Sequence, residues 1–356
     1  MKKYYALYRD IREKIEDGRL RAGDRLKSKR SCADSLGVSV ITVERAYSAL
    51  CDEGYITARV RSGYFVSDIQ PATPGKSIHA PYRPIYLPEP EENPDECDFE
   101  YSVWFSTVRK VMSERGSLLF RRAPAEGCAV LRNAISDYLY RYRDMRAQPE
   151  NIIIGSGAEQ LYESAAKLLG RDLVYGIEYP SYPPIECSYR SLGIIPRRLA
   201  LGDDGIPERE LRGIDVLHVT PYHSFPTGIT VSPAGKRRYA EWAARTGGYI
   251  IEDDFDSEFF APGHRTEPLR TLDPSGRVIY INTFSKSLSP AMRIGYMILP
   301  DGLMKKYRAC PGCSSCPVPV ADQYFLAEFI ASGNFERHLA RARRKMAQRA
   351  RAHAAK

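Results

Sequence analysis

The hydrophobic pattern at the start of the chain predicts three short helices. The first carries apolar residues at three- and four-residue spacing and ends at Gly18. Ser28 can cap a second helix that runs to Leu36, and Ser39 can cap a third helix after a turn at Gly37. Two helices joined by a glycine-containing turn are typical of a helix-turn-helix unit. The residues that the third helix is predicted to bury are Val43, Ala46, Tyr47 and Leu50.

A hairpin wing is predicted directly after the third helix. Residues 55–57 and 64–66 have the pattern of two short strands, and arginines lie in and beside their connection. In such a unit the third helix enters the major groove of double-stranded DNA, and the wing reaches the backbone or the minor groove. The alternative is a small helical domain with solvated arginines, and the added wing argues against it. The candidate DNA contacts are Arg30, Ser39, Thr42, Arg45 and Arg61.

The larger part of the chain alternates helical patterns with short apolar runs. The predicted buried strands lie at 152–154, 216–219, 249–251 and 278–281, and the predicted helices between or before them lie at 129–142, 159–169 and 234–244. Strands that alternate with helices indicate an α/β domain with a mostly parallel sheet. Ligands of such sheets bind beyond the carboxyl ends of the strands.

Residues that can carry chemistry follow three of these predicted strands. The small-residue turn at 155–158 can bring backbone N–H groups to an anion at a helix N-terminus. The acidic residues at 252–256 can bind a metal, transfer a proton or pair with a cationic cofactor nitrogen. Lys286 lies between two serines, with Arg293 further on, and such a lysine can form a Schiff base beside a phosphate cup. A lone lysine is usually a solvated surface group, but three such sites at three strand ends favour a functional site.

Composition and charge narrow the class of protein. No apolar run reaches the roughly 18 residues of a membrane span, and the N-terminus has no apolar segment of a signal peptide. We therefore expect a cytoplasmic protein that does not associate with membranes. The net charge is +8, distributed as +4 over 1–68, −4 over 69–336 and +8 over 337–356. The basic N-terminal module favours a nucleic-acid partner, and the basic C-terminal segment is predicted to be a solvated helix.

The spacing of the cysteines bears on metal binding, and the run of prolines bears on how the chain divides into domains. Cys310, Cys313 and Cys316 have a spacing found at iron–sulfur and zinc sites. Such sites need four ligands and this motif supplies three, so we predict no metal site there. Residues 67–98 hold seven prolines and an acidic run, which is typical of a semi-rigid linker. The predicted organisation is a winged helix at 1–68, a linker at 69–99 and an α/β domain at 100–356.

Residues 4–67 closely resemble the winged-helix domain of GntR-type regulators. The matching segments are 15–20, 23–26, 36–39, 42–47 and 53–55. Lys27 and Val40 depart from the family pattern, since the family has a proline at the first position and a basic residue at the second. The change at Val40 removes one expected DNA contact, so affinity or sequence preference is expected to differ from the family's.

Residues 100–345 resemble the fold-type I pyridoxal-phosphate enzymes of the aspartate aminotransferase superfamily. The resemblance is strongest to the MocR-type regulators, which carry a GntR-type head. The matching segments are 127–132, 155–160, 178–182, 221–228, 252–259, 283–300 and 335–339. The resemblance implies pyridoxal 5'-phosphate as cofactor and a head-to-tail homodimer.

The same resemblance implies roles for individual residues. Lys286 would form the Schiff base with the cofactor, Asp253 would hold the pyridine nitrogen protonated, and Tyr182 would stack on the ring. The residues that would cradle the phosphate are Ser156, Gly157, Ala158, Ser285 and Arg293. The departures from the family pattern are Phe255, where a Tyr commonly donates to the phenolate oxygen, Pro184, where an arginine can bind the substrate carboxylate, and Tyr222 and Ser224 around His223.

These observations favour a transcription regulator whose winged helix binds an operator and whose aminotransferase-like domain senses a small amine or amino acid. One alternative is an active aminotransferase with an appended DNA-binding head. Another is a degenerate chain whose second domain only dimerises, which the retained Lys286, Asp253 and Arg293 argue against. The chain is expected to be truncated, because it stops at Lys356 inside a basic helix and before the family's carboxylate-binding arginine. We therefore expect cofactor binding without efficient transamination.

Overall fold

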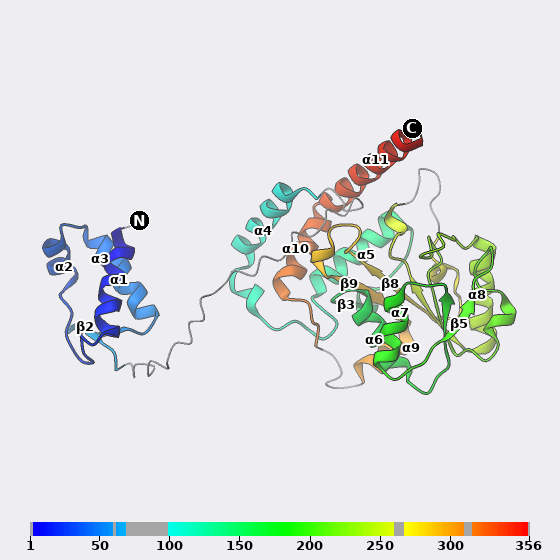
Figure 1. Ribbon diagram of the computed structural model, residues 1–356, viewed down its shortest axis with the longest axis horizontal. Helices are drawn as coiled ribbons and strands as arrows, with labels where there is room; N and C mark the ends of the chain where they lie inside the picture. The colour runs from blue at the N-terminus through cyan, green and yellow to red at the C-terminus, as the bar shows by residue number, and fades with distance from the viewer. Residues whose placement is uncertain (1–2, 60–61, 69–98, 260–266, 310–314, 355–356) are drawn as a thin grey trace. The chain divides into compact units, whose positions relative to one another are not determined.

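The computed structural model describes residues 3–59, 62–68, 99–259, 267–309 and 315–354 (Figure 1). The chain divides into two compact units, residues 1–90 and residues 91–356. The predicted linker at 69–99 lies outside the described residues except for Phe99. Within the described ranges, no helix combines the length and apolar character needed to cross a membrane.

The first unit is a winged helix. Its elements are α1 (Lys3–Glu16), α2 (Lys29–Leu36), α3 (Val40–Asp52), β1 (Ile56–Arg59) and β2 (Gly63–Val66). The predicted caps are confirmed, because the Ser28 and Ser39 side chains accept hydrogen bonds from the backbone N–H groups of Ser31 and Thr42. The predicted apolar face of α3 is also confirmed, with Val43, Ala46, Tyr47 and Leu50 all buried.

The wing is a two-stranded antiparallel hairpin in which Ile56 pairs with Val66 and Arg59 with Gly63. The first strand extends two residues further than the sequence pattern predicted, so Arg59 lies in β1 and not in the connection. Its guanidinium packs over the Phe65 ring, 4.6 Å from the centroid, so a cation–π contact joins the two strands of the wing.

The second unit is built on a mixed, mostly parallel sheet. Its described strands are β3 (Ile152–Gly155), β4 (Tyr175–Tyr179), β5 (Arg197–Ala200), β6 (Val216–Val219), β7 (Tyr249–Asp253), β8 (Val278–Thr283) and β9 (Gly295–Ile298). Their order is β3-β9-β8-β7-β6-β4-β5. Among them β9 alone runs antiparallel to its neighbours. The predicted fold class is confirmed, and β4, β5 and β9 are strands that the sequence pattern did not predict.

Helices cover both faces of this sheet (Figure 1). The described helices are α4 (Tyr101–Arg115), α5 (Ala129–Arg143), α6 (Ala158–Leu169), α7 (Pro183–Ser191), α8 (Pro233–Thr246), α9 (Asp301–Arg308), α10 (Val320–Ala331) and α11 (Asn334–Ala354). One face packs against α6, α7 and α9, and the other against α5, α8 and α10. Neighbouring strand residues alternate between these layers, as Ile250 and Ile251 do on β7, so the central strands are buried on both faces.

The strand register brings the predicted strand-end residues to one edge of the sheet. Gly155 at the end of β3 and Thr283 at the end of β8 both pair with Gly295 at the start of β9. Asp253 at the end of β7 pairs with Ile281 on β8. Because β9 runs in the opposite direction, its beginning lies at the same edge as the carboxyl ends of the other strands. The turn after β3, the acidic segment after β7 and the connection from β8 to β9 therefore meet there.

Candidate functional site

A cavity of about 270 Å³ lies at this carboxyl edge of the sheet. Its lining residues are Ala158, Glu159, Tyr162, Tyr182, Thr220, Phe225, Asp253, Phe255, Thr283, Ser285, Lys286 and Arg293. They come from the ends of β7 and β8, the segments that follow β4, β6, β7 and β8, and the first two turns of α6. Six of the eight residues predicted for the cofactor are among them. The other two, Ser156 and Gly157, precede α6 and lie beside the cavity wall.

Asp253 places a carboxylate with one unsatisfied oxygen at this cavity. The residue is the last of β7 and is buried, with 3% of its surface exposed. Its Oδ2 accepts a short hydrogen bond from the Tyr162 hydroxyl, and its Oδ1 has no hydrogen-bond partner among the described residues. Burial raises the pKa of this carboxyl to about 7. A buried oxygen without a partner destabilises the protein unless something satisfies it, so the site fits a ligand that offers a cationic N–H group.

The first turn of α6 and Arg293 lie together in an arrangement suited to an anion. Gly157 precedes the helix with a φ of +110°, and a Cβ atom there would lie 3.0 Å from Nη2 of Arg293. Glycine is therefore required for the guanidinium to approach the turn. The first N–H groups of a helix have no partner within the helix and attract anions. A guanidinium that faces such a turn can bind a phosphate group together with the N–H groups of the turn.

Lys286 follows β8 and enters the same cavity. Its Nζ lies 2.8 Å from Oδ1 of Asp256 and 5.2 Å from the centroid of the Phe255 ring. The contact with Asp256 is an ion pair without the alignment of a hydrogen bond. The other oxygen of Asp256 lies 2.9 Å from Nδ1 of His223. Asp256 therefore links the lysine to a histidine whose side chain is 45% exposed, a connection that the sequence pattern did not reveal.

The remaining departures from the family pattern also lie around this edge. Phe255 lines the cavity with a ring that cannot donate a hydrogen bond. Tyr182 packs edge-on against Phe225, with ring centroids 6.1 Å apart, and Tyr222 stacks on His223. Pro184 lies in the first turn of α7 and is not among the lining residues.

Glu178 is a buried acid that the sequence analysis did not single out. It lies on β4 with 2% of its surface exposed, and its Oε2 accepts a 2.6 Å hydrogen bond from the Ser224 hydroxyl. Burial raises the pKa of Glu178 to about 8. Its other oxygen has no partner among the described residues, which fits a protonated carboxyl. Its sequence signals were an acid within an otherwise apolar segment and its place at the start of the matching segment 178–182.

The exposed face of α3 carries most of the predicted DNA contacts. Ser39 caps the helix, and its hydroxyl oxygen lies 2.8 Å from that of Thr42. Arg45 is exposed and has no ion-pair partner in the described part of the chain, whereas the neighbouring Glu44 is paired with Lys29 at 2.5 Å. Arg30 is exposed on α2. The predicted contact Arg61 lies outside the described residues.

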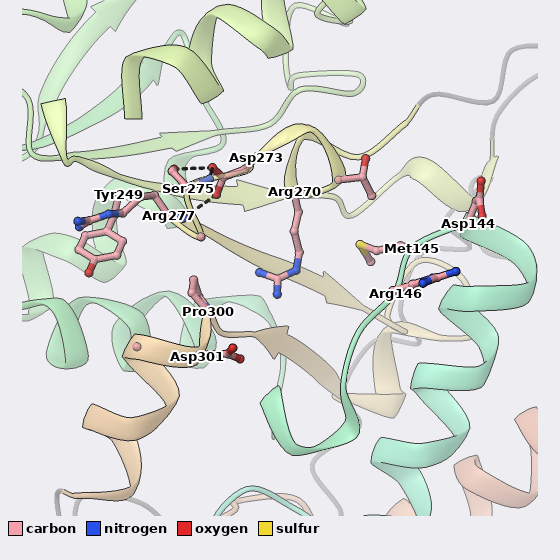
Figure 2. A pocket seen from close by; sticks show the side chains of 13 residues that line it. Asp144, Met145, Arg146, Tyr249, Arg270, Asp273, Ser275, Arg277, Pro300 and Asp301 are labelled. Atoms are coloured by element: carbon pink, nitrogen blue, oxygen red, sulfur yellow. Dashed lines mark hydrogen bonds between the residues drawn. The ribbon is translucent and has the colours of Figure 1, made fainter. Parts of the chain in front are cut away.

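A larger hollow of about 740 Å³ lies at the opposite edge of the sheet, near the start of β7 and β8 (Figure 2). Figure 2 shows the Arg270 side chain reaching into it, where its Nη1 donates 2.7 Å to the carbonyl of Val278. Asp273 accepts hydrogen bonds from Ser275 and from the backbone of Arg277. These polar groups already have partners, and none of the predicted site residues lines the hollow.

The cysteine motif is only partly visible in the structure. Cys310 and Cys313 lie outside the described residues, and Cys316 is half-buried with its sulfur 3.4 Å from Nε2 of Gln323. In the ranges that the structure describes, no three His, Cys, Asp or Glu residues are arranged to hold a metal ion.

Comparison with known proteins identifies the two parts of the chain. The family model of bacterial regulatory proteins of the gntR family matches residues 3–66. Over 96% of the chain, the sequence is 34% identical to the uncharacterised HTH-type transcriptional regulator YdeL of Bacillus subtilis, covering 76% of that relative. It is 29% identical to the probable rhizopine catabolism regulatory protein MocR of Rhizobium meliloti, over 96% of the chain and 74% of that relative.

The second unit has the fold of an aminotransferase. It is similar to the solved structure of LysN, an α-aminoadipate aminotransferase of Thermus thermophilus in complex with N-(5'-phosphopyridoxyl)-L-leucine. The TM-score is 0.60 and the identity 26%, over 69% of this chain and 64% of that one. The chain therefore spans less than two thirds of the aminotransferase.

A gntR-type winged helix joined to an aminotransferase fold defines a class of HTH-type transcription regulators. The chain belongs to this family and, within it, to the MocR type. It is a DNA-binding transcription regulator, as its sequence predicted, and the hypothesis of an enzyme with an appended DNA-binding head is the less favoured one.

Proposed function

We propose that this regulator holds pyridoxal 5'-phosphate in the cavity around Lys286 and uses it to sense a small amine or amino acid. The observation that carries the proposal is the buried Oδ1 of Asp253, which has no partner among the described residues. The cofactor's ring nitrogen, when protonated, is the kind of group that satisfies it. The same cavity offers a lysine amine and an anion site.

Each part of the cofactor has a matching group in the cavity. Asp253 would pair with the ring nitrogen, and Tyr182 would cover the ring. The first turn of α6, with Ser156, Gly157 and Ala158, would hold the phosphate together with Ser285 and Arg293. When bound, the cofactor supplies an electrophilic carbon that can link to Lys286 or to an incoming amine.

Asp256 and His223 are suited to move the proton that such an exchange requires. An amine attacks carbon only after it has lost its proton, and Asp256 lies 2.8 Å from the Nζ atom that must lose it. His223 contacts the other oxygen of Asp256 and is partly exposed. The pair therefore offers a path for the proton from Nζ to solvent.

The cavity favours sensing over transamination. Arg293 is the only arginine among its described lining residues, and the proposal assigns it to the phosphate. A second guanidinium that could orient a substrate carboxylate is not among those residues, and such positioning contributes several kcal/mol to catalysis. We therefore propose that amines exchange at this site without efficient turnover.

We further propose that the regulator acts as a homodimer on its operator. In the second unit, Tyr101, Phe105 and Met112 of α4 are more than half exposed, and Phe120 just after α4 is 89% exposed. Exposed apolar residues gathered on one element are typical of a protein–protein interface. A second copy of the chain is the partner that this surface fits.

An absorbance titration of the purified full-length protein tests the sensing proposal. Adding pyridoxal 5'-phosphate should give a visible band that Lys286→Ala lacks, and adding amines should shift that band in a saturable manner. The effective amine should also change the affinity of the protein for DNA. A spectrum identical in the wild type and Lys286→Ala would contradict the cofactor site.

A further inference from the structure

The first turn of α3 exposes two large apolar side chains to solvent. Val40 is 42% exposed and Ile41 is 64% exposed. Neither belongs to the apolar core of the first unit. These two residues, the apolar pair, stand where polar side chains would be expected on a solvated helix.

Ile41 lies on the same side of α3 as Arg45, and Val40 is the exposed residue that precedes it. The helix buries residues 43, 46, 47 and 50, so the opposite side carries residues 41, 44, 45 and 48, and Val40 lies at the margin between the two sides. On that side Glu44 is already held by Lys29. The exposed surface therefore begins with the apolar pair and ends, one turn later, with a cationic side chain.

The start of a recognition helix is the part that contacts base edges in the major groove. Within that groove, the apolar group that a base pair presents is the C5 methyl of thymine. We infer that Val40 and Ile41 contact thymine methyl groups of the operator and make this regulator prefer thymine there. The inference rests on operator binding through α3, which is part of the proposed function.

Neighbouring groups support DNA as the occupant of this surface. The hydroxyls of Ser39 and Thr42 are 2.8 Å apart, and the apolar pair lies between these two candidate DNA contacts in the chain. The helix N-terminus attracts phosphate, and residues 1–68 carry a net charge of +4. A purely apolar protein partner would gain nothing from these charges.

A thymine-to-uracil exchange tests the inference directly, since it removes only the methyl group. Duplexes are first enriched from a random pool by repeated binding to the full-length protein, and each thymine is then replaced by deoxyuridine. We expect about three- to tenfold weaker binding at one or two positions. Ile41→Ser should bind the original duplex more weakly and should lose its sensitivity to the exchange at one position. Ile195→Ser, which changes a 76% exposed isoleucine of the second unit, is the matched control and should behave as wild type.

Three outcomes would overturn the inference. One is an unchanged affinity for every deoxyuridine duplex, and another is an undiminished sensitivity in both Ile41→Ser and Val40→Ser. The third is a change in the oligomeric state of Ile41→Ser by light scattering, which would assign the pair to a protein contact. A protein that binds no duplex at low salt would instead contradict the proposed operator binding, so the two failures are distinguishable.

Discussion

Oδ1 of Asp256 lies 2.8 Å from Nζ of Lys286, a lining residue of the cavity where the carboxyl ends of the strands meet. The pair joins two segments that are far apart in the sequence and that follow neighbouring strands of the sheet. It holds the amine of Lys286 within the cavity, beside the Phe255 ring. The amine is therefore in place before any ligand arrives.

Replacing Lys286 should remove covalent attachment of the cofactor. In Lys286→Ala, borohydride treatment of the protein with pyridoxal 5'-phosphate should leave the mass of the chain unchanged, because no amine remains at the cavity. Lys305→Ala, which removes an exposed lysine of α9, should label like wild type. Intact-protein mass spectrometry measures both, and equal labelling of the two variants would contradict the assignment.

Replacing Asp253 should weaken cofactor binding without unfolding the domain. Asp253→Asn keeps an acceptor for the Tyr162 hydroxyl but loses the charge that a protonated ring nitrogen needs. A charge-assisted hydrogen bond contributes about 1.5–3 kcal/mol, so the dissociation constant should rise by about ten- to a hundredfold. Equilibrium dialysis measures it, with the exposed Asp203→Asn as control. Unchanged affinity would show that the ring nitrogen lies elsewhere.

Adding a hydroxyl at Phe255 should strengthen cofactor binding. Phe255→Tyr introduces a donor beside Lys286, and a hydrogen bond contributes about 0.5–1.5 kcal/mol. We expect about two- to tenfold tighter binding by the same dialysis measurement. If the affinity does not change, another hydroxyl such as that of Tyr222 already fills the role.

The second unit should become less stable as the pH rises from 6 to 9. The pKa of Glu178 is raised to about 8 in the folded protein, whereas an unfolded glutamate has a pKa of about 4.3. Between these two pKa values the folded state binds a proton that the unfolded state does not. The stability that this proton contributes is fully present below the pKa of the unfolded state, and it is lost as the pH rises through 8. Asp253 and Glu258, each with a pKa raised to about 7 by burial, act in the same direction.

Glu178→Gln isolates the contribution of that one group. The amide is neutral at every pH and can still accept the hydrogen bond from Ser224. Thermal unfolding followed by circular dichroism should therefore show a smaller loss of Tm between pH 6 and pH 9 than in the wild type. An equal loss in both proteins would mean that Glu178 is ionised in the folded state.

Replacing Arg45 should weaken operator binding. If the guanidinium contacts a base, Arg45→Ala should lower the affinity for the operator by about 1–3 kcal/mol and relax the sequence preference at one position. If it contacts a phosphate, the loss should be equal on all sequences, with a flatter salt dependence. Gel-shift titrations at several salt concentrations distinguish the two. The control is Arg237→Ala on α8, and equal affinity of both variants on every duplex would contradict the placement of α3.

The sequence predicted the elements whose signals are local. The caps Ser28 and Ser39 and the apolar face of α3 follow from neighbouring residues, and so do the runs that form β6 and β8. The strand β4 was missed because Gly176 and Glu178 interrupt its apolar run, although burial raises the pKa of Glu178 to about 8. The edge strand β5 was missed because three of its four residues are exposed, so apolar and polar residues do not alternate along it.

The residues of the candidate site could be predicted from the sequence, but the contacts between them could not. Resemblance pointed to Lys286, Asp253 and Arg293 one by one, and the structure places all three at one cavity. The contact between Asp256 and Lys286, and that between Asp256 and His223, depend on the strand order and on the paths of the connecting segments. No spacing within the sequence encodes such contacts, because they join strand ends that become neighbours only in the folded sheet.

The reversed direction of β9 limits how this protein can vary. Thr283 and Gly295 face each other in the register, so the connection between them is a closed loop anchored at both ends. Lys286 and Arg293 lie on that loop, and its length sets the distance between the amine and the guanidinium. Inserting one residue at Pro290 should leave the seven described strands paired and yet displace one group from the other. The length of this loop thus affects ligand retention separately from folding.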